Sequence, residues 1–153
     1  MQKKQNVESI AIVGISVRTS NKNGEASVDL GVLWERFYLE NVHAQIPNII
    51  SGDIYCVYTD YESDYTGEYT AIIGYKVPFL GFIPEGLTGC LIEEGEYLKY
   101  TIRGEISSIA DVWAEIWAND SVLNRKYGTD FDVYKEKSQD IEHAEMEVYI
   151  GVR

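Results

Sequence analysis

Residues 30–38 read LGVLWERFY, and residues 109–117 read IADVWAEIW. In both stretches the large apolar side chains recur at positions i, i+3, i+4, i+7 and i+8, which is the spacing of one face of an α-helix. Ser27 or Asp29 can cap the first helix, and Ser107 or Ser108 the second. Each stretch therefore predicts an amphipathic helix, and their likeness indicates two related halves.

Segments rich in Val, Ile and Tyr flank both helices and are typical of β-strands. We expect strands at residues 7–19, 53–60, 69–77, 96–103, 131–135 and 144–152. The polar turn at 61–67 makes the second and third a hairpin. Residues 1–6 are polar and we expect them to be frayed. Residues 78–95 contain two prolines and four glycines and we expect them to connect the halves.

The resulting order is β-α-β-β, connector, β-α-β-β. It predicts an α+β fold in which an antiparallel sheet carries both helices on one face, around a pseudo-twofold axis. We expect one domain over 1–153, with halves at about 7–77 and 96–152. In the repeat Trp34 matches Trp113, Tyr58 matches Tyr134 and, at equal spacing, Ala71 matches Glu147. Because concave sites favour such interfaces, we expect a ligand groove on the axis.

The net charge of −12 argues against nucleic-acid binding, which needs a basic surface. An acidic surface attracts cations or simply keeps a protein in solution. The sequence shows neither a signal peptide nor an apolar run long enough to span a bilayer, and we expect a cytoplasmic protein without membrane contact. Cys56 and Cys90 read as free thiols.

Motifs for metal or cofactor chemistry are missing from the sequence. His43 and His143 are the two histidines, and neither has a partner at ligand spacing, so we expect no metal site. The segment Gly86-Leu87-Thr88-Gly89 lacks both the spacing and the lysine of a phosphate loop. Neither serine nor cysteine lies in a recognisable nucleophile motif, so no catalytic residue is assigned and no cofactor is expected.

Four stretches, in this order and spacing, carry a resemblance to a known family. They are residues 33–37 (LWERF), 83–87 (IPEGL) leading to 94–97 (EGEY), 131–134 (FDVY) and 144–152 (AEMEVYIGV). The chain resembles the gyrase-inhibitor-like (GyrI-like) small-molecule-binding domains, also called effector-binding domains of bacterial transcription activators, here in stand-alone form. One departure is Gly151, where the family often has proline.

The resemblance implies a duplicated β-α-β-β fold with a central aromatic pocket. In multidrug-sensing relatives a buried carboxylate there faces a cationic, lipophilic ligand, and the match makes Glu147 the best candidate. On the last strand Glu147 shares one face with Tyr149, and either face could meet solvent. A glutamate buried among aromatic rings favours a cation, whereas an ordinary exposed glutamate would do nothing.

The remaining candidates are aromatic residues and helix glutamates. Flat rings attract cations and stack on planar molecules, although the tryptophans also suit an ordinary helix core. We take as candidate ligand contacts Trp34, Trp113, Trp117, Tyr58, Tyr97 and Tyr149. Glu35, with Glu115 at nearly the same place of the second half, could add a further carboxylate or be an exposed helix residue.

Three functions follow from these residues. The first is a binding module that senses or sequesters cationic aromatic small molecules. The second is a hydrolase of reactive electrophiles, with Glu147 beside Tyr149 as acid or base. The third is a protein interaction such as inhibition of DNA gyrase, which the family name suggests. The expected partners are small organic molecules, and the chain could be a monomer or pair two copies through an exposed edge strand.

Overall fold

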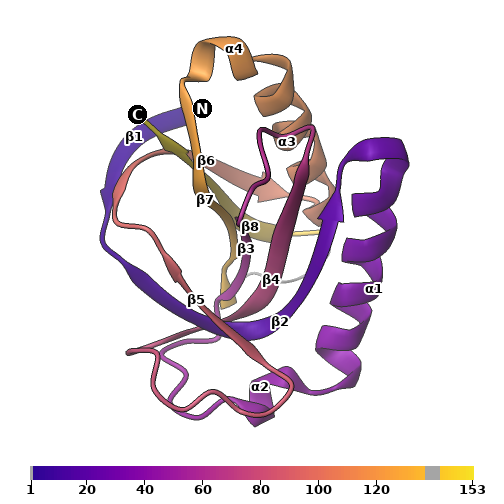
Figure 1. Ribbon diagram of the computed structural model, residues 1–153, viewed down its shortest axis with the longest axis vertical. Coiled ribbons are helices and arrows are strands. Elements are labelled where there is room, and N and C mark those ends of the chain that lie inside the picture. Colours follow the sequence, from indigo (N-terminus) through magenta and orange to yellow (C-terminus); the bar gives the residue numbers. More distant parts are fainter. Residues whose placement is uncertain (1, 137–141) are drawn as a thin grey trace.

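The computed structural model describes residues 2–136 and 142–153. Along the chain the strands are β1 (Gln2–Val7), β2 (Ile10–Ser20), β3 (Ile54–Thr59), β4 (Glu68–Val77), β5 (Thr88–Ile92), β6 (Gly95–Gly104), β7 (Arg125–Tyr134) and β8 (Ala144–Val152). The α-helices are α1 (Glu25–Leu39), α2 (Val42–Gln45), α3 (Ile109–Ala118) and α4 (Asp120–Leu123). Figure 1 shows a curved sheet with the long helices α1 and α3 beside it.

The eight strands form one antiparallel sheet in the order β1-β6-β8-β7-β3-β4-β2-β5. Read from either edge, this order visits equivalent strands of the two halves, so the pseudo-twofold axis passes between β3 and β7. Both expected helices and the β3–β4 hairpin are present. The α+β architecture predicted from the repeat is therefore confirmed.

Two strands escaped the sequence prediction. Residues 2–7 form β1, where a frayed tail was expected, and pair with β6. Residues 88–92, inside the expected connector, form β5 and pair with β2. Each half thus receives an edge strand from the segment that precedes the other half. β1 has no alternation of polar and apolar residues that would predict a strand, because both of its faces are exposed at the edge of the sheet.

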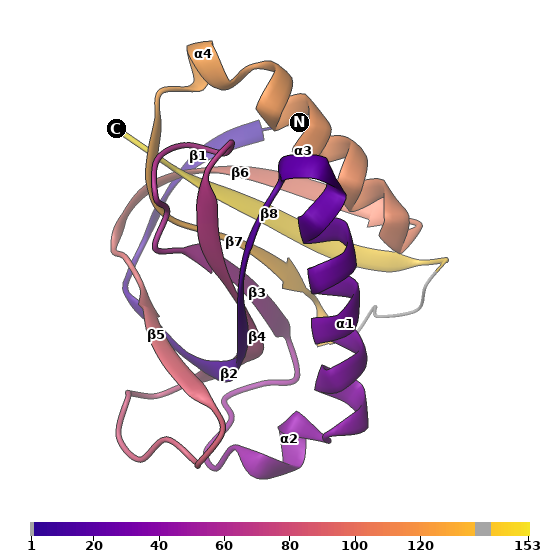
Figure 2. The ribbon, with the colours of Figure 1, turned by 45° about the vertical axis from the view of Figure 1, so that its right-hand side comes forward.

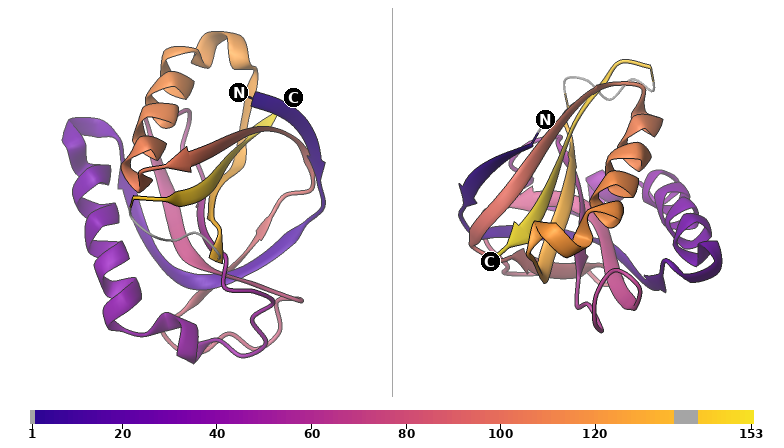
Figure 3. Two further views of the ribbon diagram at one scale, coloured as in Figure 1. Left: turned by 180° about the vertical axis from the view of Figure 1, so that it is seen from behind. Right: turned by 90° about the horizontal axis from the view of Figure 1, so that it is seen from above.

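The two faces of the sheet carry separate apolar cores. Both long helices pack on the same face, where Leu33 and Phe37 of α1 and Ile116 of α3 join one cluster with sheet residues such as Ile73 and Met146. Figures 2 and 3 show this arrangement from three further directions. The opposite face carries a smaller, aromatic-rich cluster of Ile12, Tyr55, Val57, Ile72, Ile92, Tyr97, Phe131, Val133 and Tyr149. The curved sheet is therefore covered on one side and lined with rings on the other.

The register of the last hairpin corrects the internal alignment. Tyr58 lies opposite Ala71 in the β3–β4 ladder, whereas Tyr134 lies opposite Met146 and Glu147 lies opposite Val133. A shift of one residue moves a side chain to the other face of a sheet. Glu147 accordingly lies with Tyr149 on the face away from the helices, and is not the counterpart of Ala71.

The helix starts also differ from expectation. α1 begins at Glu25 after Gly24, whose φ of 73° needs the freedom of glycine, so Ser27 and Asp29 lie within the helix. α3 follows Ser108 as expected, although Ser108 Oγ donates to the Glu105 carbonyl and caps no helix N–H. In the described part of the chain, no helix has both the length and the apolar character that crossing a membrane requires.

Candidate functional site

A cavity of about 400 Å³ lies between α1, α3 and the β3–β4 hairpin, on the helix-bearing face of the sheet. Six aromatic side chains contribute to its wall: Tyr58, Tyr61, Tyr65, Tyr69, Trp113 and Trp117. Ala26, Leu30 and Ala110 add small apolar surfaces. A hollow of this size with mostly apolar walls suits a drug-sized organic molecule.

Three elements place the rings of the wall. Tyr58 is the second-last residue of β3 and Tyr69 the second residue of β4, and their rings meet edge to face at 5.8 Å between centroids. Trp113 and Trp117 are one helical turn apart on α3 and point from the same side. Tyr65, from the hairpin turn, lies nearly parallel to Trp117, with an angle of 11° and 6.2 Å between the ring centroids. The cavity is thus bounded by rings from two separate parts of the chain.

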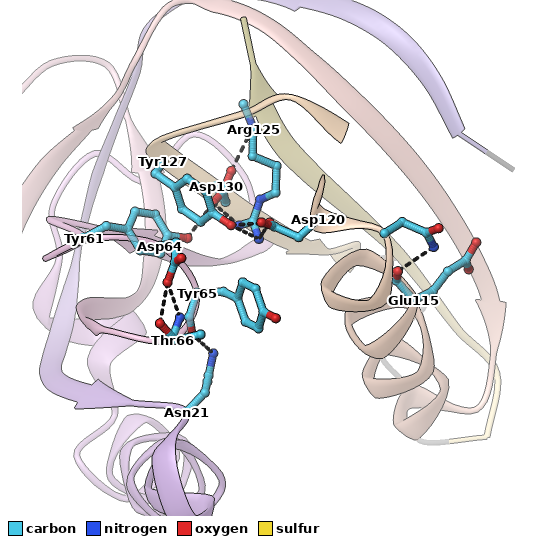
Figure 4. A network of polar contacts seen from close by, with 12 residues as sticks. Asn21, Tyr61, Asp64, Tyr65, Thr66, Glu115, Asp120, Arg125, Tyr127 and Asp130 are labelled. Carbon is cyan, nitrogen blue, oxygen red and sulfur yellow. Dashed lines mark hydrogen bonds and ion pairs between the residues drawn. The ribbon is translucent and has the colours of Figure 1, made fainter. Parts of the chain in front are cut away.

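Asn21 ties the hairpin turn to the segment before α1. Its side-chain amide donates to the Tyr65 carbonyl at 2.9 Å, and its amide oxygen accepts a hydrogen bond from the Tyr69 hydroxyl at 3.0 Å. Asp64 accepts hydrogen bonds from the backbone N–H and the hydroxyl of Thr66 within the turn (Figure 4). The turn that carries Tyr65 is therefore held in place by specific polar contacts.

A buried carboxylate lies directly behind the aromatic wall. Asp132, on the central strand β7, is 1% exposed. The Tyr58 hydroxyl donates to its Oδ2 at 2.7 Å, and the Trp113 indole N–H donates to its Oδ1 at 2.9 Å. Burial raises the pKa of Asp132 to about 7, while the two hydrogen bonds oppose that rise. Two wall residues therefore connect the cavity to a carboxyl group that titrates near neutrality.

A second acidic group, Asp130, forms a buried ion pair with Arg125. Its Oδ2 lies 2.8 Å from Arg125 Nη2 and accepts a hydrogen bond from the Tyr61 hydroxyl, and its Oδ1 accepts the Gly151 N–H at 2.8 Å. Arg125 lines the cavity, lies over the Tyr127 ring at 4.4 Å and contacts Asp120 at 3.4 Å. Figure 4 shows the Arg125 side chain reaching from the start of β7 into this group. The positive charge of Arg125 is thus shared between two carboxylates.

The structure separates the residues expected from the sequence into four places, three on the helix-bearing side and one on the opposite face of the sheet. Tyr58, Trp113 and Trp117 line the cavity. Trp34 packs within the helix-side core against Tyr134, at 5.1 Å between ring centroids, and does not line the cavity. Glu35 and Glu115 are exposed on their helices.

Glu147, Tyr97 and Tyr149 lie on the opposite face of the sheet. Glu147 is 9% exposed, and its carboxylate lies 3.0 Å from Lys99 Nζ and 3.6 Å from Lys135 Nζ. The Tyr149 hydroxyl donates to it at 3.1 Å. The glutamate and tyrosine suggested for acid or base chemistry are therefore adjacent, but two lysines hold the glutamate and the sheet separates it from the cavity.

The sequence analysis did not single out Asp130 and Asp132, nor the cavity residues Tyr61, Tyr65 and Tyr69. A usable signal was present, because Asp130, Asp132 and Tyr134 alternate with the apolar Phe131 and Val133 on one strand. Strand alternation places both aspartates on the face that bears the helices. For metals, the described residues contain no group of three or more His, Cys, Asp or Glu side chains that could hold an ion.

Comparison with known proteins identifies the family. The sequence pattern of Cass2, the integron-associated effector binding protein, matches residues 5–152. The chain belongs to this family. The resemblance to effector-binding domains is thereby confirmed. In general terms, this chain binds a small-molecule effector.

Individual relatives cover nearly the whole of this Cass2-family chain. The integron cassette protein of Vibrio cholerae is 27% identical, with a TM-score of 0.78 over 99% of this chain and 95% of that one. YobU of Bacillus subtilis (strain 168), named as a candidate transcriptional regulator, is 24% identical over 144 residues, 92% of this chain and 90% of YobU. SAV2435, whose structure is solved with tetraphenylphosphonium bound, shares the fold with a TM-score of 0.78 at 16% identity, over 100% of this chain and 94% of SAV2435.

Proposed function

We propose that the protein binds a lipophilic, aromatic cation in the cavity between α1 and α3, with Asp132 supplying the negative charge. The observation that carries this proposal is the shared carboxylate. The Tyr58 hydroxyl and the Trp113 N–H, both in the cavity wall, donate to the two oxygens of Asp132. A cation against these rings therefore lies one side chain away from a buried negative group.

The aromatic wall supplies most of the contact surface. A cation over a ring face gains about 0.5–2 kcal/mol per ring, and more when water is excluded. The near-parallel pair Tyr65 and Trp117 presents flat faces at the edge of the cavity. Rings impose loose demands on shape, so we expect several cations of similar size to bind.

The charge balance behind the wall also favours a cation. Arg125 is compensated by Asp130 at 2.8 Å and Asp120 at 3.4 Å. Asp132 has no cation as a partner in its described contacts, only the two neutral donors. Ionisation of Asp132 is opposed by burial, and a bound cation would offset that cost.

The family and one structural relative support the same ligand class. SAV2435, which shares this fold, binds tetraphenylphosphonium, a lipophilic aromatic cation. Of the residues expected from the sequence, Tyr58, Trp113 and Trp117 keep their role as ligand contacts in this proposal. The role of the buried carboxylate passes from Glu147 to Asp132.

Tryptophan fluorescence tests the proposal directly, because two of the three tryptophans lie in the wall. In a Trp34→Phe background, tetraphenylphosphonium should quench the remaining emission saturably. Asp132→Asn should weaken its binding about tenfold or more, and should leave the neutral analogue triphenylphosphine oxide unchanged. Glu147→Gln is the matched control and should bind the cation like the parent.

Two outcomes would contradict the proposal. Equal affinity of the Asp132→Asn variant and its parent for tetraphenylphosphonium would remove Asp132 as the counter-charge. Loss of binding in Glu147→Gln alone would move the site to the opposite face of the sheet.

A further inference from the structure

The outward face of α1 is largely apolar, whereas the exposed face of a surface helix is ordinarily polar. Val28, Val32 and Leu39 of this face are 66%, 54% and 76% exposed. Glu35 lies among them and is exposed as well. The opposite face of the helix packs on the sheet, and Figure 1 shows α1 at the outer rim of the molecule. α1 therefore has two apolar faces, of which the sheet covers one.

The spacing of these four residues is that of a coiled-coil seam. The steps between them along the chain are four, three and four residues, which is the alternation of a and d positions in a heptad. Side chains at this spacing form one line along a helix and interlock with the side of a second helix. We call Val28, Val32, Glu35 and Leu39 the outer stripe of α1. Its geometry fits one helix lying alongside.

The equivalent face of α3 serves as an internal comparison. At the spacing that matches Trp34 with Trp113, the outer stripe corresponds to Ser107, Asp111, Ala114 and Ala118. All four are exposed, and each is polar or small. The repeated fold therefore does not require large apolar side chains at these positions. Contiguous apolar surface beyond what the fold requires marks an interaction site.

The charges on this face of α1 select the kind of partner. Among the described residues Glu35 has no cationic partner, and the neighbouring Arg36 is already paired with Glu40 at 2.8 Å. Glu25, at the preceding heptad position, adds a second carboxylate to the same line. A carboxylate covered by a partner must meet a cation, because an unpaired buried charge is costly. A second copy of the chain would bring only the same two carboxylates and an arginine that Glu40 already holds.

We propose that the outer stripe of α1 binds a basic amphipathic helix of another protein. Apolar residues of that helix cover Val28, Val32 and Leu39, and a lysine or arginine pairs with Glu35. The net charge of −12 attracts such a helix and speeds the encounter. The contact does not depend on what the cavity binds, since Ala26 and Leu30 place the cavity on the inner side of α1.

A designed peptide tests the chemistry of the stripe on the full chain. The probe is a synthetic helix of about three heptads, with leucine at the a and d positions, lysine at one central d position and flanking lysines that keep it from pairing with itself. Fluorescence anisotropy of the labelled peptide should show saturable binding at about 0.15 M salt. Combining Val32→Ala with Leu39→Ala should weaken binding about tenfold or more. Val122→Ala on α4, at a residue that is 75% exposed, is the matched control and should leave binding unchanged.

Exchange of the central charge separates a specific contact from general attraction. A second peptide carries glutamate in place of the central lysine. The parent should prefer the lysine peptide about tenfold, and Glu35→Arg should reverse this preference. Glu115→Arg, at an exposed position on α3, changes the net charge by the same amount and should keep the preference of the parent.

Circular dichroism confirms that each variant is folded before its binding is measured. Absence of saturable binding overturns the proposal, as does binding that Val32→Ala with Leu39→Ala leaves unchanged. Equal effects of Glu35→Arg and Glu115→Arg overturn it too, because overall charge alone would then attract the peptide. A dimer in sedimentation equilibrium that Leu39→Ala dissociates would assign the stripe to a second copy instead.

Discussion

Asp132 on β7 lies directly opposite Cys56 on β3, in the central pair of strands. The internal repeat that superposes Tyr58 on Tyr134 also superposes Cys56 on Asp132, so these residues occupy equivalent positions of the two halves. One is a carboxyl group held by Tyr58 and Trp113, and the other is a thiol. The two halves of this nearly symmetric fold therefore differ chemically at their shared centre. The aromatic cavity lies next to Asp132, because the two residues that donate to its carboxyl group also line the cavity.

Burial of Asp132 should make stability depend on pH. Its pKa is raised to about 7, from an ordinary value of 3.8, so the folded state holds this proton more tightly than the unfolded state. Below about pH 4 both states are protonated, and between about 4 and 7 the free energy of unfolding falls as pH rises. The whole loss is at most about 4 kcal/mol.

Urea denaturation of the parent and of Asp132→Asn isolates this contribution. The stability of the parent relative to the variant should decrease from pH 4 to pH 7 and level off above it. A difference that stays constant across this range would show that Asp132 titrates in the folded protein as it does in the unfolded chain.

Cation binding should depend on the same group, but the affinity should rise with pH, whereas the stability falls. A cation favours ionised Asp132, so below pH 7 the carboxyl group must first release its proton. Between pH 6 and pH 8 the affinity for tetraphenylphosphonium should rise about tenfold. Isothermal titration in buffers of different ionisation enthalpy should reveal proton release on binding at pH 6. The Asp132→Asn variant should show neither effect, and a pH-independent affinity in the parent would contradict this linkage.

The ion pair of Arg125 and Asp130 should be strongly coupled. Asp130 is fully buried and Arg125 nearly so, and 2.8 Å separates their charged atoms. Arg125→Met should cost about 3–5 kcal/mol of stability, because it leaves a buried carboxylate unpaired. In a double-mutant cycle with Asp130→Asn, we expect the double variant to recover about 1–3 kcal/mol of the summed losses.

An exposed ion pair next in the chain provides the control. Lys126 and Glu93 are 3.6 Å apart and about half exposed, so Lys126→Met should change stability by less than about 0.5 kcal/mol. Additive effects of Arg125→Met and Asp130→Asn would mean that the two charges do not depend on each other.

Periodicity in the sequence was enough to predict the helices, the hairpin and the repeat. The apolar stripes of α1 and α3 are local signals, and in the structure both stripes pack against the same face of the sheet. β1 and β5 were missed because edge strands need no alternation of polar and apolar residues. Their partners lie in the opposite half of the chain, at a distance that no local pattern encodes.

The candidate site was predicted in part. Tyr58, Trp113 and Trp117 follow from strand and helix spacing, and all three line the cavity. Glu147 was assigned through resemblance to a family, and the structure places it on the face of the sheet opposite the cavity, because in a strand one residue decides the face. Alternation of Asp130 and Asp132 with buried apolar residues could have shown that both lie on the helix-bearing face, but only the β3–β7 pairing brings them to the centre of the sheet.

Two glycines in different settings should respond in opposite ways to alanine. Gly74 of β4 lies opposite Gly14 of β2, and a Cβ atom on Gly74 would lie 2.1 Å from the Val13 carbonyl oxygen. Since backbone would have to move, Gly74→Ala should cost about 1–3 kcal/mol. Gly31, in the middle of α1, has open space around its Cα, so Gly31→Ala should add about 0.5–1 kcal/mol through helix propensity. Urea denaturation of both variants measures the contrast, and a neutral Gly74→Ala would mean that β2 and β4 do not depend on this close approach.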